Sequence, residues 1–212
     1  PHVNCVNITP DQKYLCAVDL GVDQVKIYKF NDETGKITLV DMLRCELESA
    51  PRIIKFSPDG RFAYLICELK NYISVYTYKD GPRGPVFELV QTISTLNEYH
   101  SKGSAACVLR FSRDWNYVLC SNAGDNSVGI FKIDRETGML EKICILPVSG
   151  DYPKAADFFP DNRHIMSLNH ETNTMTIFKI NYEKKYFSMW GKPLKVETPN
   201  CILVSEIEKF LR

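Results

Sequence analysis

Two pairs of polar residues share one spacing and could supply an anion-binding or hydrolytic site. Arg52 is followed sixteen residues later by Glu68, and Lys154 is followed at the same distance by His170. Two cations suit a phosphate or carboxylate group, which arginine binds through a planar fork of donors. A carboxylate near a histidine can activate water or move a proton. A hydrolytic step needs such a base and also donors for the developing oxyanion.

The shared spacing follows from a repeat of about fifty residues that returns four times. An aspartate stands at +1 of every unit, and an aromatic residue stands at +18. Periods of this length are typical of stacked supersecondary units such as propeller blades. The zero of each unit is taken as Pro10, Pro58, Arg113 and Pro160.

Two repeat positions lie where strands are expected to meet one end of the stack. Equivalent positions of stacked units form a ring, so the register predicts that Arg52, Glu68, Lys154 and His170 converge at one channel mouth. Position −6, entering the first strand, holds Asn4, Arg52, Cys107 and Lys154, and position +10, leaving the second strand, holds Leu20, Glu68, Ala123 and His170.

Each unit has the pattern of four antiparallel strands. In the second unit Pro58-Asp59-Gly60 forms a turn, and the nearly continuous apolar run 62–66 is typical of a strand covered on both faces. Residues 174–180 alternate cleanly, as half-buried strands do. The sequence therefore predicts an all-β protein, a β-propeller of four-stranded antiparallel blades with four blades present. The stretch 80–104 is expected to form an extended loop.

The C-terminal residues repeat a blade opening. Pro199-Asn200 and the apolar run 201–204 match Pro51-Arg52 and its strand, so we expect an inner strand over 199–205 without outer strands of its own. The chain is interpreted as one partial propeller domain, 1–212, the C-terminal part of a longer ring. Its uncovered end sheets predict self-association or association with the missing N-terminal blades. The expected blades are about 1–49, 50–102, 103–152 and 153–198.

Composition excludes several classes of partner. The 26 basic and 26 acidic residues give a formal net charge of zero, so nothing supports a nucleic-acid or anionic-membrane partner. No segment is apolar and long enough to span a bilayer. The eight cysteines form no C-x-x-C pair, and most lie in apolar runs, as expected for reduced core cysteines of a cytoplasmic protein. No spacing suggests a metal site, and no cofactor is expected.

The chain resembles the lactonase family of seven-bladed propellers, which includes the propeller-type 6-phosphogluconolactonases and the carboxymuconate lactonising enzymes. The resemblance covers the whole chain and implies about seven blades in the full ring. The segments that carry it are Pro1-His2-Val3-Asn4, Asp19-Leu20-Gly21, Pro51-Arg52, Glu68-Leu69, Thr92-Ile93-Ser94-Thr95-Leu96, Ser121-Asn122 and Pro153-Lys154.

The resemblance implies a sugar-lactone hydrolase that acts on 6-phosphogluconolactone, a small anionic substrate. Arg52 and Glu68 match the family's catalytic arginine and glutamate. A family histidine falls on Asn4, while its neighbour His2 is present. The catalytic set is then Glu68, Arg52 and His2, and the substrate-binding set is Lys154, His170 and Asn4. The family's arginine after Ser-Asn falls on Ala123, and its histidine after Pro-Arg falls on Ile53.

Other interpretations remain open. A carboxymuconate-type cycloisomerase would share the same family segments. A non-catalytic propeller could bind a protein or a small anion at the same mouth, because propellers host many unrelated functions. Arg52 and Glu68 could also be an ordinary ion pair that locks adjacent strands, and His170 could be a solvated turn residue.

Overall fold

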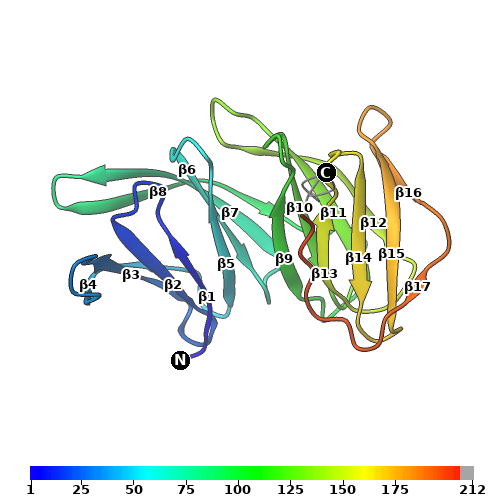
Figure 1. Cartoon of the computed structure of the whole chain (residues 1–212), viewed down its shortest axis with the longest axis horizontal. Coiled ribbons are helices and arrows are strands. Elements are labelled where there is room, and N and C mark those ends of the chain that lie inside the picture. The colour runs from blue at the N-terminus through cyan, green and yellow to red at the C-terminus, as the bar shows by residue number, and fades with distance from the viewer. Residues whose placement is uncertain (206–212) are drawn as a thin grey trace, which may run out of the picture.

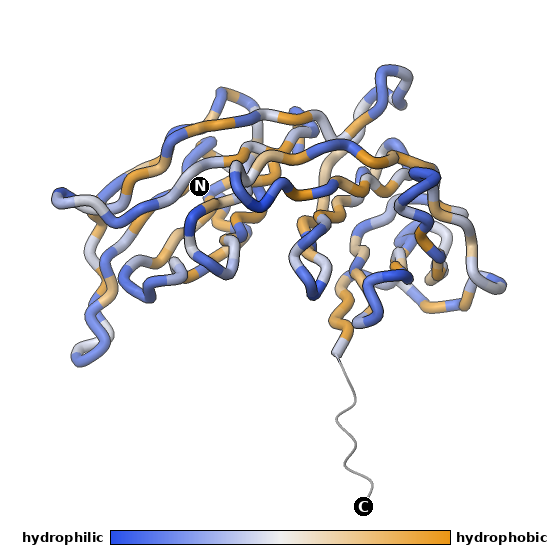
Figure 2. Tube along the Cα trace, turned by 90° about the horizontal axis from the view of Figure 1, so that it is seen from above, coloured by the Kyte–Doolittle hydropathy of each residue, from blue (hydrophilic) through white to orange (hydrophobic). Residues whose placement is uncertain are grey.

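The chain folds into four antiparallel sheets that stand side by side in an arc. The computed structural model describes residues 1–205, and the sheets follow one another from blue at the left to red at the right of Figure 1. The view from above shows the same row of sheets curving (Figure 2). The strands are β1 Val3–Ile8, β2 Tyr14–Asp19, β3 Gln24–Phe30, β4 Ile37–Arg44, β5 Pro51–Phe56, β6 Phe62–Cys67, β7 Tyr72–Gly81, β8 Gly84–Ser94, β9 Ala106–Phe111, β10 Tyr117–Asn122, β11 Ser127–Ile133, β12 Leu140–Pro147, β13 Pro153–Phe158, β14 His164–Asn169, β15 Thr174–Asn181, β16 Tyr186–Met189 and β17 Leu194–Lys195.

Each sheet is a blade whose strands pair in chain order. The orders β1-β2-β3-β4, β5-β6-β7-β8 and β9-β10-β11-β12 confirm the predicted antiparallel blades. In the last blade the outer strand is divided, since β16 and β17 both pair with β15. The chain leaves the sheet between them at Gly191, whose φ of 82° lies in the left-handed region.

The +1 aspartate recurs because it closes the turn between the first and second strands. The Ser57 hydroxyl donates to Asp59 Oδ1 at 2.6 Å, and the Arg61 backbone N–H donates to the same oxygen at 3.1 Å. Thr9 with Asp11 and Ser112 with Asp114 repeat the contact at 2.6 Å. The residue that follows the aspartate, which is Gln12, Gly60 or Trp115, takes a positive φ, as a tight hairpin turn requires.

Acid should weaken this turn. Burial alone would raise the pKa of Asp59, but hydrogen bonds from Ser57 and Arg61 outweigh it and lower the pKa to about 2. A carboxyl whose pKa is depressed by folding stabilises the fold above its unfolded pKa, and that contribution is lost as the pH falls from about 4 to about 2. We expect Asp59→Asn to reduce the free energy of unfolding by about 1 kcal/mol at pH 7 and by much less at pH 2.

Urea unfolding at the two pH values measures the difference. Asp32→Asn is the control, because no hydrogen bond of the Asp32 carboxylate occurs among residues 1–205. An equal loss of stability at both pH values would contradict this role of Asp59.

A polar residue at +13 joins each blade to the next. Asp23, Asn71, Asn126 and Asn173 all have positive φ, between 51° and 54°. The backbone N–H groups of Ala50, Tyr152 and Thr198 donate to three of these side chains at 2.7 to 2.8 Å. Asn71 instead donates to the Ser104 carbonyl at 2.9 Å. The contact of Asn173 with Thr198 repeats this junction, so the chain after the fourth blade follows the same path as the chain that enters the second and fourth blades.

The inner strand predicted over 199–205 does not form. Residues 201–205 have no strand pairing, although Ile202 is buried and packs with Val204 against the core between the last two sheets. The physical reason is that an inner strand pairs with the second strand of its own blade, and none of the described strands takes that place.

The loop predicted over 80–104 is wrong for residues 80–94, which form two strands and the turn between them, whereas residues 95–105 lie outside the strands. β7 and β8 continue as a long hairpin whose turn is Pro82-Arg83, with Gly81 paired to Gly84. The hairpin projects toward the first sheet (Figure 1). There Asp80 accepts from Lys13 Nζ at 2.5 Å and from the Tyr14 hydroxyl at 2.9 Å.

Three hydrophobic clusters fill the spaces between neighbouring sheets. The +18 aromatics Tyr76, Phe131 and Phe178 each belong to one of these clusters, on the side of the preceding blade. Tyr28 is only half-buried, since no described sheet precedes the first blade. On that blade Val6 and Ile8 are 56% and 54% exposed.

We therefore expect these 212 residues to self-associate in dilute solution unless further blades cover them, because exposed apolar surface of this kind marks an interface. Replacing Val6 and Ile8 with lysine should shift the chain toward the monomer in light scattering. Leu47→Lys is the control, since Leu47 is 79% exposed on a turn outside the sheet. A monodisperse monomer of the unmodified chain would overturn the expectation.

Candidate functional site

The −6 residues share an irregular backbone position. The pairing of the first and second strands shifts between Val3 and Cys5, between Pro51 and Ile53, and between Pro153 and Ala155, and Cys107 is skipped opposite Ser121 and Asn122. β-bulges re-aim a side chain away from the regular pleat and are frequent next to active sites. The unpaired bulge residues are Asn4, Arg52, Cys107 and Lys154.

Arg52 and Glu68 form the centre of this mouth. The guanidinium of Arg52 bonds to Oε2 of Glu68, which confirms the predicted contact, and Arg52 Nε donates to the Cys107 carbonyl at 2.9 Å. Both side chains keep about a fifth of their surface exposed, at 22% and 21%. The other oxygen of Glu68 makes no hydrogen bond to residues 1–205. The pair is therefore oriented and open to a small ligand.

The backbone around Glu68 is fixed by the same blade junction. Its N–H donates to the Ala50 carbonyl at 2.8 Å, and its carbonyl accepts from the Ala106 N–H at 3.0 Å. Asn4 Nδ2 donates to the Arg52 carbonyl at 3.3 Å. Side chains and carbonyls of successive −6 residues thus link the first three inner strands. This geometry fits a rigid mouth and also the structural ion pair considered above.

Lys154 and Arg52 lie on either side of Cys107 in the ring. Their charges act on the Cys107 thiol, but burial dominates and raises its pKa. The thiol therefore stays protonated and is a poor nucleophile. Lys154 Nζ makes no hydrogen bond within residues 1–205, so its ammonium group is open to an anion.

The two histidines do not join Glu68 in the described part of the chain. His170 Nδ1 lies 3.2 Å from the Pro199 carbonyl, and the His170 N–H donates to the Tyr152 carbonyl at 3.0 Å. The backbone N–H of His2 donates to Asp19 Oδ1 at 2.6 Å, which anchors the residue beside the first blade. The imidazole of His2 makes no hydrogen bond within residues 1–205. Neither imidazole contacts the carboxylate that it was predicted to assist.

Of the two apolar residues at positions where the resemblance implied polar ones, Ala123 lies in the core and Ile53 packs against it. Ala123 is fully buried, and its N–H donates to the Ala105 carbonyl at 2.8 Å. Ile53 packs against the cluster between the second and third sheets. At these two positions apolar side chains pack into or against the core, so the mouth has no ionisable group there.

A second ring of polar residues was not predicted. Asn7, Lys55, Arg110 and Asp157 stand at −3 of the four units. Arg110 Nε lies 3.6 Å from Asp157 Oδ2, and this buried nitrogen makes no hydrogen bond to any residue between 1 and 205. Burial raises the pKa of Asp157, with the charges of Arg110 and Lys55 opposing the rise. The register that identified the mouth could also have identified this ring.

Neither a metal centre nor a membrane span emerges within residues 1–205. No group of three histidine, cysteine, aspartate or glutamate side chains in this range could hold a metal ion. Its helical content includes nothing long and apolar enough to cross a bilayer.

The fold and the mouth together define a β-propeller whose polar residues gather where its inner strands begin. A family model described as lactonase, 7-bladed beta-propeller, matches residues 1–204. The chain belongs to this lactonase family.

Three of the similar proteins have names that refer to lactonases. The 6-phosphogluconolactonase of Bacillus subtilis is 26% identical over 202 residues, covering 95% of this chain and 57% of that protein. The periplasmic gluconolactonase structure of Pseudomonas aeruginosa has a TM-score of 0.85 at 27% identity, over 94% of this chain and 56% of that one. A structure titled putative 6-phosphogluconolactonase from Bacteroides fragilis has a TM-score of 0.82 at 29% identity, over 95% and 57%. The chain thus spans about half the length of these relatives.

Proposed function

We propose that the protein containing this chain hydrolyses a sugar lactone, and that its substrate is 6-phosphogluconolactone. The observation that carries the proposal is the Arg52–Glu68 pair at the bulge of an inner strand, where one carboxylate oxygen is bound and the other is open. The names of the relatives support the substrate class.

In the proposed reaction the open oxygen of Glu68 takes a proton from a water molecule. At the same time the oxygen of that water attacks the lactone carbonyl carbon. The donors of Arg52 that face the mouth stabilise the developing oxyanion. The ring carbon–oxygen bond then breaks, and the leaving alkoxide takes up the proton. The carboxylic acid formed releases its own proton to solvent, so one lactone and one water give an open-chain carboxylate and one proton, and no other reactant is needed. Lys154 holds the phosphate group, and Asn4 positions Arg52. His2 and His170 contact the substrate at the edge of the mouth.

A non-catalytic role is the second candidate, because Arg52 also links two blades through the Cys107 carbonyl and the His170 imidazole contacts the Pro199 carbonyl instead of Glu68. Assay of the whole protein on 6-phosphogluconolactone separates the two. Hydrolysis above the spontaneous rate supports the enzyme, and its absence in a folded protein favours a binding module.

The charge of Lys154 should separate phosphorylated from unphosphorylated substrates. We expect Lys154→Gln to raise KM for 6-phosphogluconolactone about tenfold, since losing one open cation-to-phosphate contact costs about that factor. KM for gluconolactone, which lacks the phosphate, should hardly change. Lys192→Gln is the control, because Lys192 is an exposed lysine between β16 and β17 of the last blade. Equal effects on both substrates would exclude Lys154 as a phosphate ligand.

We also place this reaction in the cytoplasm. Cys16, Cys67, Cys107, Cys120 and Cys144 are buried as free thiols, and burial raises the pKa of Cys16 and Cys120 to about 12. Unpaired cysteines are common where thiols are kept reduced. Cell fractionation tests the placement, with the periplasm as the opposing outcome.

A further inference from the structure

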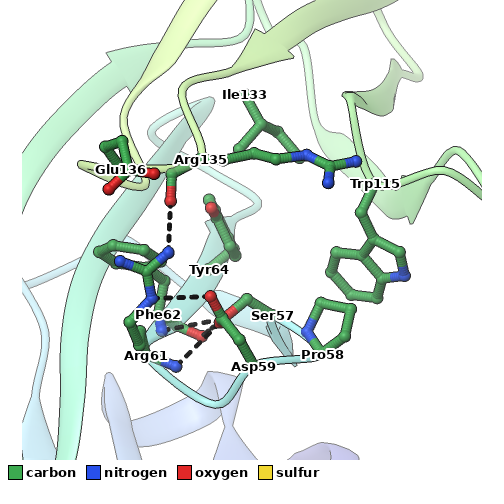
Figure 3. A pocket seen from close by; sticks show the side chains of 10 residues that line it. All are labelled: Ser57, Pro58, Asp59, Arg61, Phe62, Tyr64, Trp115, Ile133, Arg135 and Glu136. Carbon is green, nitrogen blue, oxygen red and sulfur yellow. Dashed lines mark hydrogen bonds and ion pairs between the residues drawn. The ribbon is translucent and has the colours of Figure 1, made fainter.

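A pocket of about 280 Å³ lies at the opposite end of the blades from the mouth. It opens between the second and third sheets and is built from their turns, so both of its walls belong to this chain (Figure 3). Its walls are Pro58, Phe62, Tyr64, Trp115 and Ile133, and its rim carries Arg61, Arg135, Asp59 and Glu136.

The pocket has an aromatic wall, and one of its residues, Trp115, has a strained backbone conformation. Trp115 occupies the +2 position of its turn with a φ of 55°, where the other units have Gln12, Gly60 and Asn162. A positive φ is costly for so bulky a residue. The indole stacks on Phe111 at a centroid distance of 4.3 Å and leaves its other side toward the pocket. Tyr64, fixed by its hydroxyl to the Gly138 carbonyl at 3.0 Å, forms the floor.

The charges at the rim are not equivalent. The Arg61 guanidinium already has partners within the protein, because it donates to Asp59 at 2.7 Å and to the Arg135 carbonyl at 2.7 Å. Arg135 uses one terminal nitrogen on the Asp114 carbonyl, and its remaining donors bond to nothing in residues 1–205. Figure 3 shows its side chain running along the pocket toward Trp115. A guanidinium group with open donors therefore stands next to an aromatic face.

From this arrangement we propose that the pocket binds a small aromatic carboxylate. The flat ring lies against Trp115 and Pro58, and the carboxylate bonds to Arg135 through the fork of donors. The volume of about 280 Å³ is enough for a ligand of one or two rings. The site is separate from the lactonase mouth, so it constitutes a second binding function of the propeller.

Benzoate is the test probe, with uncharged benzamide of the same shape as its match. The chain has two tryptophans, so Trp190→Phe leaves Trp115 as the single reporter of fluorescence. In this background benzoate should change the Trp115 emission saturably, and benzamide should bind at least about tenfold more weakly because it lacks the charge. A linear, non-saturating change, or equal binding of the two probes, overturns the proposal.

Two variants test the roles of the residues. Arg135→Gln should weaken benzoate binding about tenfold, whereas Arg83→Gln, at the tip of the β7–β8 turn, should leave it unchanged. Trp115→Asn should abolish binding in calorimetry without unfolding the hairpin, because Asn162 holds the same turn position in the last blade. Unchanged benzoate affinity in Arg135→Gln or in Trp115→Asn rejects the site.

Discussion

Replacing Glu68 with glutamine in the whole protein should lower lactone turnover by roughly 10²–10⁴-fold, the usual contribution of one positioned general base. The amide keeps the size of the side chain and an oxygen for Arg52, but it cannot take a proton from water. The loss should therefore appear in kcat, with KM changed much less. Initial rates of 6-phosphogluconolactone hydrolysis, corrected for the spontaneous reaction, measure both constants.

A purely structural role of the Arg52–Glu68 ion pair predicts a different result. If the pair only locks adjacent strands of the second blade, Glu68→Gln lowers the melting temperature and leaves the turnover of the folded fraction intact. Glu88→Gln serves as the control, because Glu88 is 61% exposed and pairs with Lys79 on the outer hairpin. A folded Glu68→Gln protein with the full rate would remove Glu68 from the mechanism.

The position of this pair could be predicted from the repeat register. Antiparallel pairing places Pro51 opposite Cys67, so Arg52 and Glu68 must leave neighbouring strands at the same end. The bulge then turns both toward the mouth. The direction of His170 could not be predicted, because it depends on a contact with Pro199, twenty-nine residues away, that no local spacing encodes.

The two wrong predictions concern segments whose local sequence is compatible with more than one structure. Gly81, Pro82 and Gly84 lie in the stretch that was expected to form a loop, but Pro82-Arg83 is the two-residue turn of a continuous hairpin, and the glycines pair across it. The strand predicted over 199–205 has the right sequence and the right entry at Thr198, yet it lacks a partner. Local pattern specifies that a segment can become a strand, whereas hydrogen-bonding neighbours decide whether it does.

Gly138 should be the least replaceable glycine of the outer hairpins. Its φ is 73°, and a Cβ added there would lie 2.4 Å from Phe62 Cδ1, well inside van der Waals contact. Phe62 cannot move away easily, because it is 6% exposed within the cluster between the second and third sheets. The left-handed backbone costs alanine about 1–2 kcal/mol, and overpacking adds about 1–3 kcal/mol. Gly138→Ala should therefore lower the melting temperature by about 10 °C.

Gly35 is the matched control for this substitution, because it holds the same place in the hairpin of the first blade. Its N–H donates to the Asn31 carbonyl at 2.8 Å, as that of Gly138 donates to Asp134 at 2.8 Å, and its φ is 68° with no atom within 4 Å of an added Cβ. Gly35→Ala thus carries only the backbone cost, about 1–2 kcal/mol. The difference between the two melting temperatures isolates the overlap with Phe62. Phe62→Leu combined with Gly138→Ala should recover part of that difference, since the smaller side chain relieves the contact. If Gly35→Ala and Gly138→Ala destabilise the chain equally, the packing of Phe62 beneath Gly138 contributes nothing to the intolerance.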